Sequence, residues 1–272
     1  MAEIQAQLAR IQLFPIKSLD AVALREARIG PNGGLELDRA WAMFGPNGAW
    51  INGKRTFAIH ALRAAFAEDL SAVTLSVADG PHAPERSPSF PPATFPFPAG
   101  ARQAAAWLSD FFGEHVVVHY APEGFPDDGL APGPTIVSTA SLEAVCAWFP
   151  GVTLDSARLR FRTSLELGGV PAFWEDRLFA AEETAVVRFR IGEVLFEGSN
   201  PCARCGVPPR EPATGEVTHT FQKRFSEARQ AALPPWAPAE RFDHFYRLAV
   251  NTRVPSSERG KLLRLGDAVT LL

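Results

Sequence analysis

Residues 200–217 read NPCARCGVPPREPATGEV, and this loop is the most informative part of the sequence. Two of the chain's three cysteines, Cys202 and Cys205, stand three positions apart with Arg204 between them. The prolines around them exclude a helix, because a proline ring removes a backbone N–H and clashes with the preceding turn. They also restrict loop motion, so the sulfur atoms are expected to keep fixed positions.

A C-x-x-C pair alone supports four interpretations. A structural zinc site needs four ligands, and only Cys146 and six scattered histidines remain to complete it. A thioredoxin-type dithiol belongs at a helix start, which the prolines deny. The cysteines can also be a buried structural pair. In the fourth interpretation Cys205 is a single thiolate ligand for a soft metal, Arg204 beside it favours the ionised sulfur, and Cys202 is a structural neighbour.

Outward from the loop, the second half predicts strands with a few helices. Residues 184–198, TAVVRFRIGEVLFEG, alternate apolar residues with arginines and turn back at Gly192, which predicts a hairpin leading into the loop. The closing residues 261–272, KLLRLGDAVTLL, predict a last hairpin around a Gly-Asp turn. A helix is expected after Ser138 or Thr139, with Cys146 on its apolar face.

The first half is rich in predicted strands, near residues 8–15, 21–29, 40–44, 72–77 and 115–120. Asn-Gly pairs at 31–34 and 45–48 indicate tight turns, and residues 101–112 predict one helix. Residues 81–98 contain seven prolines and exclude a helix or a central strand. Turn-forming residues at 121–134, APEGFPDDGLAPGP, suggest a boundary between domains at 1–125 and 130–272.

Composition restricts the class of protein. Of 272 residues, 46% are hydrophobic and 21% charged, as in a soluble globular protein. A formal net charge of -3 without a basic run argues against nucleic-acid binding but leaves room for a small anionic ligand. The N-terminus has no signal-peptide pattern and no stretch is apolar enough to span a membrane, so a cytoplasmic location with reduced thiols is expected.

These blocks carry a resemblance to a known family. NPCARC followed by the Thr-Gly turn of PREPATGEV resembles the signature loop of MOSC-domain proteins. FPIKS at 14–18, followed by LDRAW at 37–41, resembles the N-terminal β-barrel domain that precedes MOSC in the mitochondrial amidoxime-reducing component and its bacterial relatives. The resemblance covers nearly the whole chain. It implies a β-rich α+β fold, in which an N-terminal β-barrel-like domain is followed by a MOSC β-barrel-like domain with peripheral helices.

The resemblance also implies a cofactor. Family members bind a molybdenum cofactor, a pyranopterin with dithiolene sulfurs and a phosphate, and an association with pyridoxal phosphate binding exists at the family level. Cys205 matches the protein ligand to molybdenum and hence the catalytic position. In LRFRTSLEL at 159–167, Thr163 and Ser164 replace the family's Pro-Asn, and Leu248-Ala249 replaces its Phe-Gly. The expected cofactor contacts are Lys17, Ser18, Arg39, Ser138, Thr139, Arg162, Ser164, Arg204 and Asn251.

Ser138 and Thr139 have two interpretations, since their hydroxyls can receive an anion or simply cap a helix. Because Lys17 and Arg39 come from the first domain and Cys205 from the second, the cofactor is expected between the two. The implied activity is reduction of N-hydroxylated or N-oxide-type small molecules, with electrons from an external iron–sulfur or cytochrome partner, because the chain lacks a ferredoxin-type four-cysteine segment. The alternative is a carrier of molybdenum cofactor or of sulfur, with a persulfide on Cys205.

Overall fold

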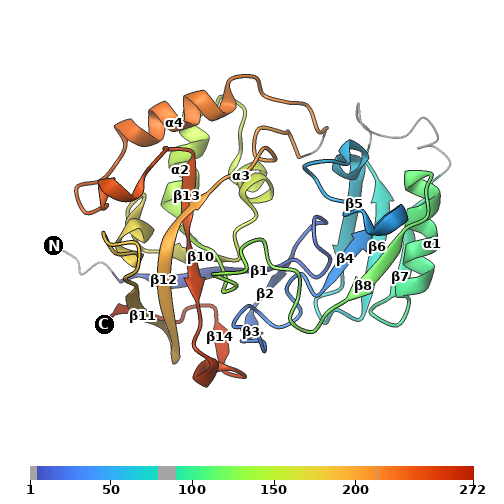
Figure 1. Cartoon of the computed structure of the whole chain (residues 1–272), viewed down its shortest axis with the longest axis horizontal. Helices are drawn as coiled ribbons and strands as arrows, with labels where there is room; N and C mark the ends of the chain where they lie inside the picture. The colour runs from blue at the N-terminus through green and yellow to red at the C-terminus, as the bar shows by residue number, and fades with distance from the viewer. Residues whose placement is uncertain (1–4, 79–89, 213) are drawn as a thin grey trace.

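The computed structural model describes residues 5–78, 90–212 and 214–272, and these form a β-rich α+β fold (Figure 1). Its α-helices are α1 (Ala101–Phe112), α2 (Thr139–Trp148), α3 (Leu154–Phe161) and α4 (Phe221–Ala231), and its 3-10 turns are η1 (Pro46–Gly48), η2 (Phe57–Ala61), η4 (Trp174–Leu178), η5 (Ala239–Arg241) and η6 (Ser256–Glu258). The strands are β1 (Gln7–Leu13), β2 (Val22–Leu24), β3 (Glu26–Arg28), β4 (Trp41–Phe44), β5 (Leu62–Phe66), β6 (Ala72–Val77), β7 (Ala93–Pro96), β8 (Val117–Tyr120), β9 (Ile136–Ser138), β10 (Leu165–Gly168), β11 (Val187–Ile191), β12 (Val194–Ala203), β13 (Arg247–Arg253), β14 (Leu262–Arg264) and β15 (Val269–Leu271).

The largest sheet has eight strands in the order β15-β11-β12-β13-β9-β10-β1-β2. The predicted hairpin forms β11 and β12, joined at the Ile191↔Val194 pair, and β12 continues directly into the cysteine loop. Inward-facing side chains of Phe189, Ile191 and Phe196 are fully buried in the core beneath this sheet. The hairpin thus ties the cysteine loop to the core beneath the large sheet.

The first two strands belong to this large sheet, although they lie in the first half of the sequence. β1 pairs antiparallel with β10 and with β2. From Ile16 to Val118 a second apolar cluster packs around Trp41, Leu75 and Leu108, with small sheets β4-β8 and β5-β6-β7 and helix α1. Figure 1 shows this part to one side of the large sheet. The domain division at 125–130 stays a prediction.

A third apolar cluster lies under helices α2 and α4. Helix α2 begins as expected, because the Ser138 side chain accepts a hydrogen bond from the Ser141 backbone N–H. Cys146 is half-buried and packs against this cluster, which agrees with its predicted place on the apolar face of the helix. Helix α4 was not anticipated from the sequence, although Phe221, Phe225 and Arg229 recur at helical spacing and are buried.

Two sequence expectations need correction. The closing residues do form two strands around a turn at Gly266, but they do not pair with each other: β14 pairs with β3, and β15 pairs with β11. The side chain of Asp267 accepts the Arg264 N–H at 2.7 Å, and the strands diverge on either side of that turn into two sheets. The strand expected over 21–29 is split, because β2 joins β1 whereas β3 joins β14.

The described part of the proline-rich segment agrees with the expectation that it forms neither a helix nor a central strand. Residues 81–89 lie outside the described residues, and the remaining part contains β7, which is an edge strand of its sheet. Both Asn-Gly segments form tight turns, and each turn is closed by one isolated β-bridge, Ile29↔Leu35 in the first and Phe44↔Trp50 in the second. None of the helices in the described ranges is long and apolar enough to cross a bilayer.

Candidate functional site

The segment 14–19 and the segment 37–41 lie side by side because their backbones bond to each other. Arg39 N donates to Phe14 O at 2.7 Å, Lys17 N donates to Trp41 O at 2.7 Å, and Trp41 N donates to Pro15 O at 3.1 Å. These backbone hydrogen bonds bring Lys17 and Arg39 close together. The two matched sequence blocks therefore converge in space.

The cysteine loop is held by the backbone on both sides of Cys205. Arg204 N donates to Tyr246 O at 3.0 Å, and the Tyr246 hydroxyl donates to Cys205 O at 3.2 Å. Cys202 and Cys205 are both half-buried free thiols that line the same cavity, but Cys202 also packs against the third apolar cluster. Packing against an apolar cluster is expected of a structural neighbour, and the assignment of Cys205 as the metal ligand stays a prediction.

Arg204 contacts a different sulfur from the one expected. Its guanidinium donates to Cys202 Sγ at 3.1 Å and to the carbonyl oxygen of Phe161, and it lies over the Phe161 ring. Residues two apart in an extended chain point to the same side, so Arg204 aligns with Cys202. Arg204 nevertheless lines the cavity, and its buried Nε has no hydrogen-bond partner among the described residues.

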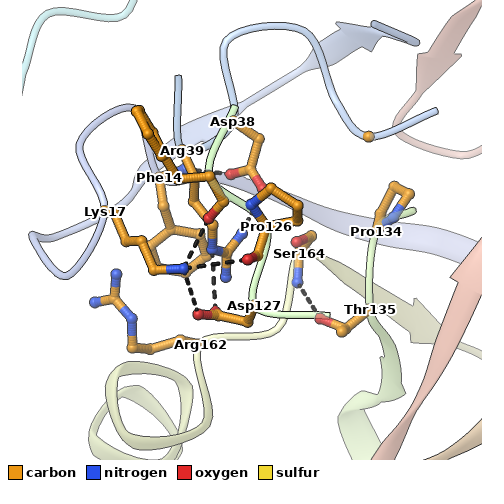
Figure 2. Close-up of polar contacts among 12 residues, drawn as sticks. Phe14, Lys17, Asp38, Arg39, Pro126, Asp127, Pro134, Thr135, Arg162 and Ser164 are labelled. Carbon is orange, nitrogen blue, oxygen red and sulfur yellow. Dashed lines mark hydrogen bonds and ion pairs between the residues drawn. The ribbon is translucent and has the colours of Figure 1, made fainter. Parts of the chain in front are cut away.

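Lys17 and Arg39 meet a carboxylate from the predicted linker (Figure 2). Asp127 forms ion pairs with Lys17 Nζ at 2.8 Å and with Arg39 Nε at 3.3 Å. Burial raises the pKa of Asp127, but its side chain is 69% exposed, and the nearby charges of Arg39 and Lys17 prevail and hold the pKa well below its usual range. Burial lowers the pKa of Arg39, but Asp38 and Asp127 outweigh that effect and leave the pKa raised. Asp127 is therefore anionic and the Arg39 guanidinium remains charged.

Arg162 lies beside this cluster from the other half of the chain. Its guanidinium donates to Leu19 O at 2.7 Å and lies over the Phe14 ring, which Arg39 also contacts. Burial and the like charge of Arg39 lower the pKa of Arg162 to about 10. It is a partly buried cation that its surroundings neutralise only in part.

Three of the expected contact residues share an unusual backbone conformation. Ser18, Arg39 and Arg162 have φ values of 74°, 51° and 50°, in the left-handed region. This conformation costs a residue with a side chain about 1–2 kcal/mol. Such strain persists where the surrounding structure fixes it and is frequent at functional sites. The strain is consistent with side chains that are held ready for a ligand.

The cavity has a volume of about 710 Å³ and is lined from both halves of the chain. This volume lies within the range of small-molecule and cofactor sites, about 300–1,000 Å³. Of the expected residues, the lining includes Lys17, Ser18, Arg39, Arg162, Ser164, Arg204, Cys205 and Asn251.

Ser138 and Thr139 are not among the described residues that line this cavity. Ser138 is fully buried and caps helix α2, and Thr139 donates to Glu166, which also pairs with Arg158. Their contacts fit the capping interpretation and do not fit anion binding, because Glu166 already places a carboxylate beside Thr139.

Ser164 and Asn251 are buried residues that line the same cavity, and backbone hydrogen bonds and strand pairing fix their positions. Ser164 N donates to Thr135 O and Oγ1, both at 3.2 Å. Asn251 pairs with Asn200 across β12 and β13, and its side-chain amide donates to Asp128 at 3.1 Å. Ala249 stands where the family has the glycine of its Phe-Gly pair. Its φ is 73°, and it lies in the third apolar cluster.

Sequence reasoning missed Asp127, because the linker containing it was interpreted only as a boundary. The signal was an Asp-Asp pair at 127–128 inside a proline- and glycine-rich stretch. It also missed Phe14, whose ring lies under Arg39 and Arg162. Within the described residues, no group of three or more His, Cys, Asp or Glu side chains is arranged to hold a metal ion.

Comparison with known families gives two matches that together cover most of the chain. The family described as MOSC N-terminal beta barrel domain matches residues 5–115, and the MOSC domain matches residues 135–270. MOSC domains are associated with molybdenum-cofactor sulfurase and reductase-type proteins. Among solved structures, the YUAD protein from Bacillus subtilis is 12% identical with a TM-score of 0.36, over 98% of this chain and 95% of that one. No curated protein matches the sequence.

Proposed function

The chain belongs to the MOSC-domain family, with a MOSC N-terminal β-barrel domain ahead of the MOSC domain. On this basis we propose that the protein is a reductase that binds a molybdenum cofactor. Its substrates are N-hydroxylated or N-oxide-type small molecules. Electrons come from an external iron–sulfur or cytochrome partner, because a chain with three cysteines cannot hold a four-cysteine cluster. The bound cofactor supplies the oxygen-atom chemistry, and the protein supplies binding and orientation.

One observation carries the proposal: the thiol of Cys205 lines the same cavity as the cations Lys17, Arg39 and Arg162. A thiolate is a suitable ligand for a soft metal, and guanidinium groups bind phosphate and other oxyanions in a fixed geometry. The cavity volume of about 710 Å³ is large enough for a pterin-sized ligand. The chemistry of the residues present therefore fits the cofactor.

Each residue would have a separate task. Cys205 would hold the metal through its sulfur, and the bonds of its loop to Tyr246 would fix the position of that sulfur. Lys17, Ser18 and Arg39 would hold the anionic part of the cofactor from the first half of the chain. Arg162 and Ser164 would hold it from the second half. Arg204 would orient the loop, because its guanidinium already bonds Cys202 and Phe161.

Asp127 has to leave Lys17 and Arg39 before an anionic group can bind both of them. Its side chain is 69% exposed, whereas the backbone before it is held, since Lys17 Nζ donates to Phe125 O at 2.7 Å and to Pro126 O at 3.3 Å. The exchange therefore requires movement of the Asp127 side chain and not of the core. We infer that the carboxylate of Asp127 and the cofactor anion compete for the same two cations. Competition of this kind makes cofactor loading sensitive to charge at residue 127.

The test compares two cysteine variants of the protein produced in a host that makes molybdenum cofactor. Cys205→Ser is expected to lose molybdenum and the reduction of an N-hydroxylated test compound under an artificial reductant. Cys202→Ser is expected to keep the metal and part of the activity, because Cys202 packs against the apolar cluster. Equal losses in both variants would contradict the assignment of Cys205.

A carrier of cofactor or of sulfur is the second candidate, favoured by the accessible thiol of Cys205 in a broad cavity. It predicts a labile extra sulfur on Cys205 in intact-mass spectra of untreated protein, removed by a thiol reductant. It also predicts no reductase activity under a strong artificial reductant. Molybdenum-loaded protein with activity and without the extra sulfur would exclude it.

A further inference from the structure

A smaller chamber adjoins the main cavity and contains three arginines that the proposed function does not use, Arg63, Arg160 and Arg210, beside Arg162, which it does use. Its volume is about 100 Å³, well above the ~10–15 Å³ that a single water molecule needs. Ser18, Gly53, Arg160, Arg162 and Val207 line both spaces, so the chamber lies directly against the main cavity. Its guanidinium groups come from Arg63, Arg160, Arg162 and Arg210.

Arg63 and Arg210 reach the chamber from opposite halves of the chain. Arg63, on β5, donates to the carbonyl oxygens of Leu62 at 2.8 Å and His60 at 3.0 Å, and to that of Pro212. Arg210, on the loop after Cys205, lies over the Phe57 ring, 4.4 Å from its centroid. Both guanidinium groups are thus held in place by neutral partners.

Arg160 is the most strongly fixed of the four, with its side chain only 2% exposed. It donates to Ser156 Oγ at 3.1 Å and Pro208 O at 2.8 Å, and it pairs with Glu211 at 2.5 Å. Arg162 donates to Leu19 O. The burial and ordering of these side chains mean that the entropy of fixing them is lost on folding rather than on ligand binding.

The chamber has an excess of positive charge. A carbonyl oxygen satisfies a guanidinium N–H without neutralising its charge, so the bonds to Leu62, His60 and Leu19 leave the cations uncompensated. Among the described lining residues Asp20 is the one carboxylate, and its oxygen accepts the Ala64 N–H at 3.0 Å. At the chamber itself four guanidinium groups face two carboxylates, Asp20 and the Glu211 partner of Arg160, while Asp127 and Asp38 act on Arg162 from the side of the main cavity.

We propose that this arginine chamber binds a phosphate-type oxyanion, recognised by Arg63, Arg160, Arg162 and Arg210. Guanidinium groups match the tetrahedral oxyanions in geometry and bond them with charge assistance. The occupant is either free phosphate or a phosphate arm of a ligand in the main cavity, because the two spaces share five lining residues. Binding of the free anion does not depend on the proposed molybdenum chemistry.

The experiment titrates inorganic phosphate into the full chain, prepared without cofactor, by isothermal calorimetry at fixed ionic strength. Arg63→Gln and Arg210→Gln are each expected to weaken phosphate binding about tenfold, the effect of losing charge-assisted hydrogen bonds. Arg210→Lys keeps the charge and should recover part of the affinity. Arg188→Gln is the matched control, since Arg188 is an exposed arginine paired with Glu197 on the large sheet. Circular dichroism and thermal unfolding verify that each variant is folded.

Lys17→Gln distinguishes the chamber from the main cavity. Phosphate affinity that falls in Lys17→Gln but not in Arg63→Gln or Arg210→Gln would overturn the proposal, as would an absence of binding to the wild-type chain. Repeating the titration with cofactor-loaded protein separates the two sources. Phosphate binding that persists identifies a separate anion site, whereas binding that disappears, with faster pterin loss from Arg210→Gln, identifies a phosphate arm of the bound ligand.

Discussion

Glu175 is a buried acid whose charge destabilises the fold, and this predicts that Glu175→Gln stabilises the protein at alkaline pH. The residue lies on η4 at 1% exposure, and neither carboxylate oxygen has a hydrogen-bond partner of ordinary geometry among the described residues. Burial, followed by the charge of Asp176, raises the pKa of Glu175 to about 7, and the nearby Ser141 and Ser138 hydroxyls offset this only in part.

The magnitude follows from linkage between protonation and folding. A glutamate has a pKa of about 4.3 in an unfolded chain, so between that pH and about 7 the folded protein holds a proton that the unfolded chain has lost. The free energy of unfolding therefore falls as pH rises through this window, by about 1.4 kcal/mol per pH unit and about 4 kcal/mol in all, of which about 3 kcal/mol lies above pH 5. Glutamine carries no charge, so the variant avoids this loss.

The assay is urea unfolding of wild type and Glu175→Gln at pH 5, 6, 7 and 8. The two proteins should have similar stability at pH 5, and the variant should gain up to about 3 kcal/mol by pH 8. Glu183→Gln, at an exposed position, controls for the general effect of removing an acid. A stability difference that is the same at pH 5 and pH 8 would refute the reasoning.

Three further predictions concern other parts of the molecule. Asp127→Asn should slow pterin release from the loaded protein severalfold, because Lys17 and Arg39 lose a competing carboxylate, and unchanged release would contradict the competition. Asp176→Asn should lower the free energy of unfolding in urea by about 3–5 kcal/mol, because it leaves Arg229 charged and buried between the Phe173 and Phe242 rings. A decrease below about 1 kcal/mol would contradict this. Gly198→Ala should lower the melting temperature strongly, because its Cβ would lie 1.6 Å from Leu178 O, whereas Gly206→Ala, with nothing within 4 Å, is the control that should change little.

Several elements could be predicted from the sequence because local patterns determine them. Helix α1 matches its predicted range of 101–112, and β6 matches 72–77, since each has an unbroken periodicity of apolar residues. The hairpin of β11 and β12 was evident from alternation around Gly192. The convergence of 14–18 with 37–41 came from a family resemblance rather than from periodicity, and the bonds between Arg39 and Phe14 give its physical basis.

The rest depends on contacts between distant residues. The separation of β14 from β15 is decided by their partners β3 and β11, which no local pattern indicates. The side chain of Arg204 contacts Cys202 because the two residues lie two positions apart at the extended end of β12. Asp127 becomes part of the site only when the linker folds back over Lys17, and the chamber arginines come from β5, α3 and the cysteine loop. Single-sequence reasoning does not bring such segments together.

X-ray absorption at the molybdenum edge tests most directly whether the Cys205 sulfur holds the metal. Wild type and Cys202→Ser, both loaded with cofactor, should have the same number of sulfur neighbours around molybdenum, and Cys205→Ser should have one fewer. An unchanged sulfur count in Cys205→Ser, or wild-type protein without molybdenum from a cofactor-producing host, would contradict the assignment.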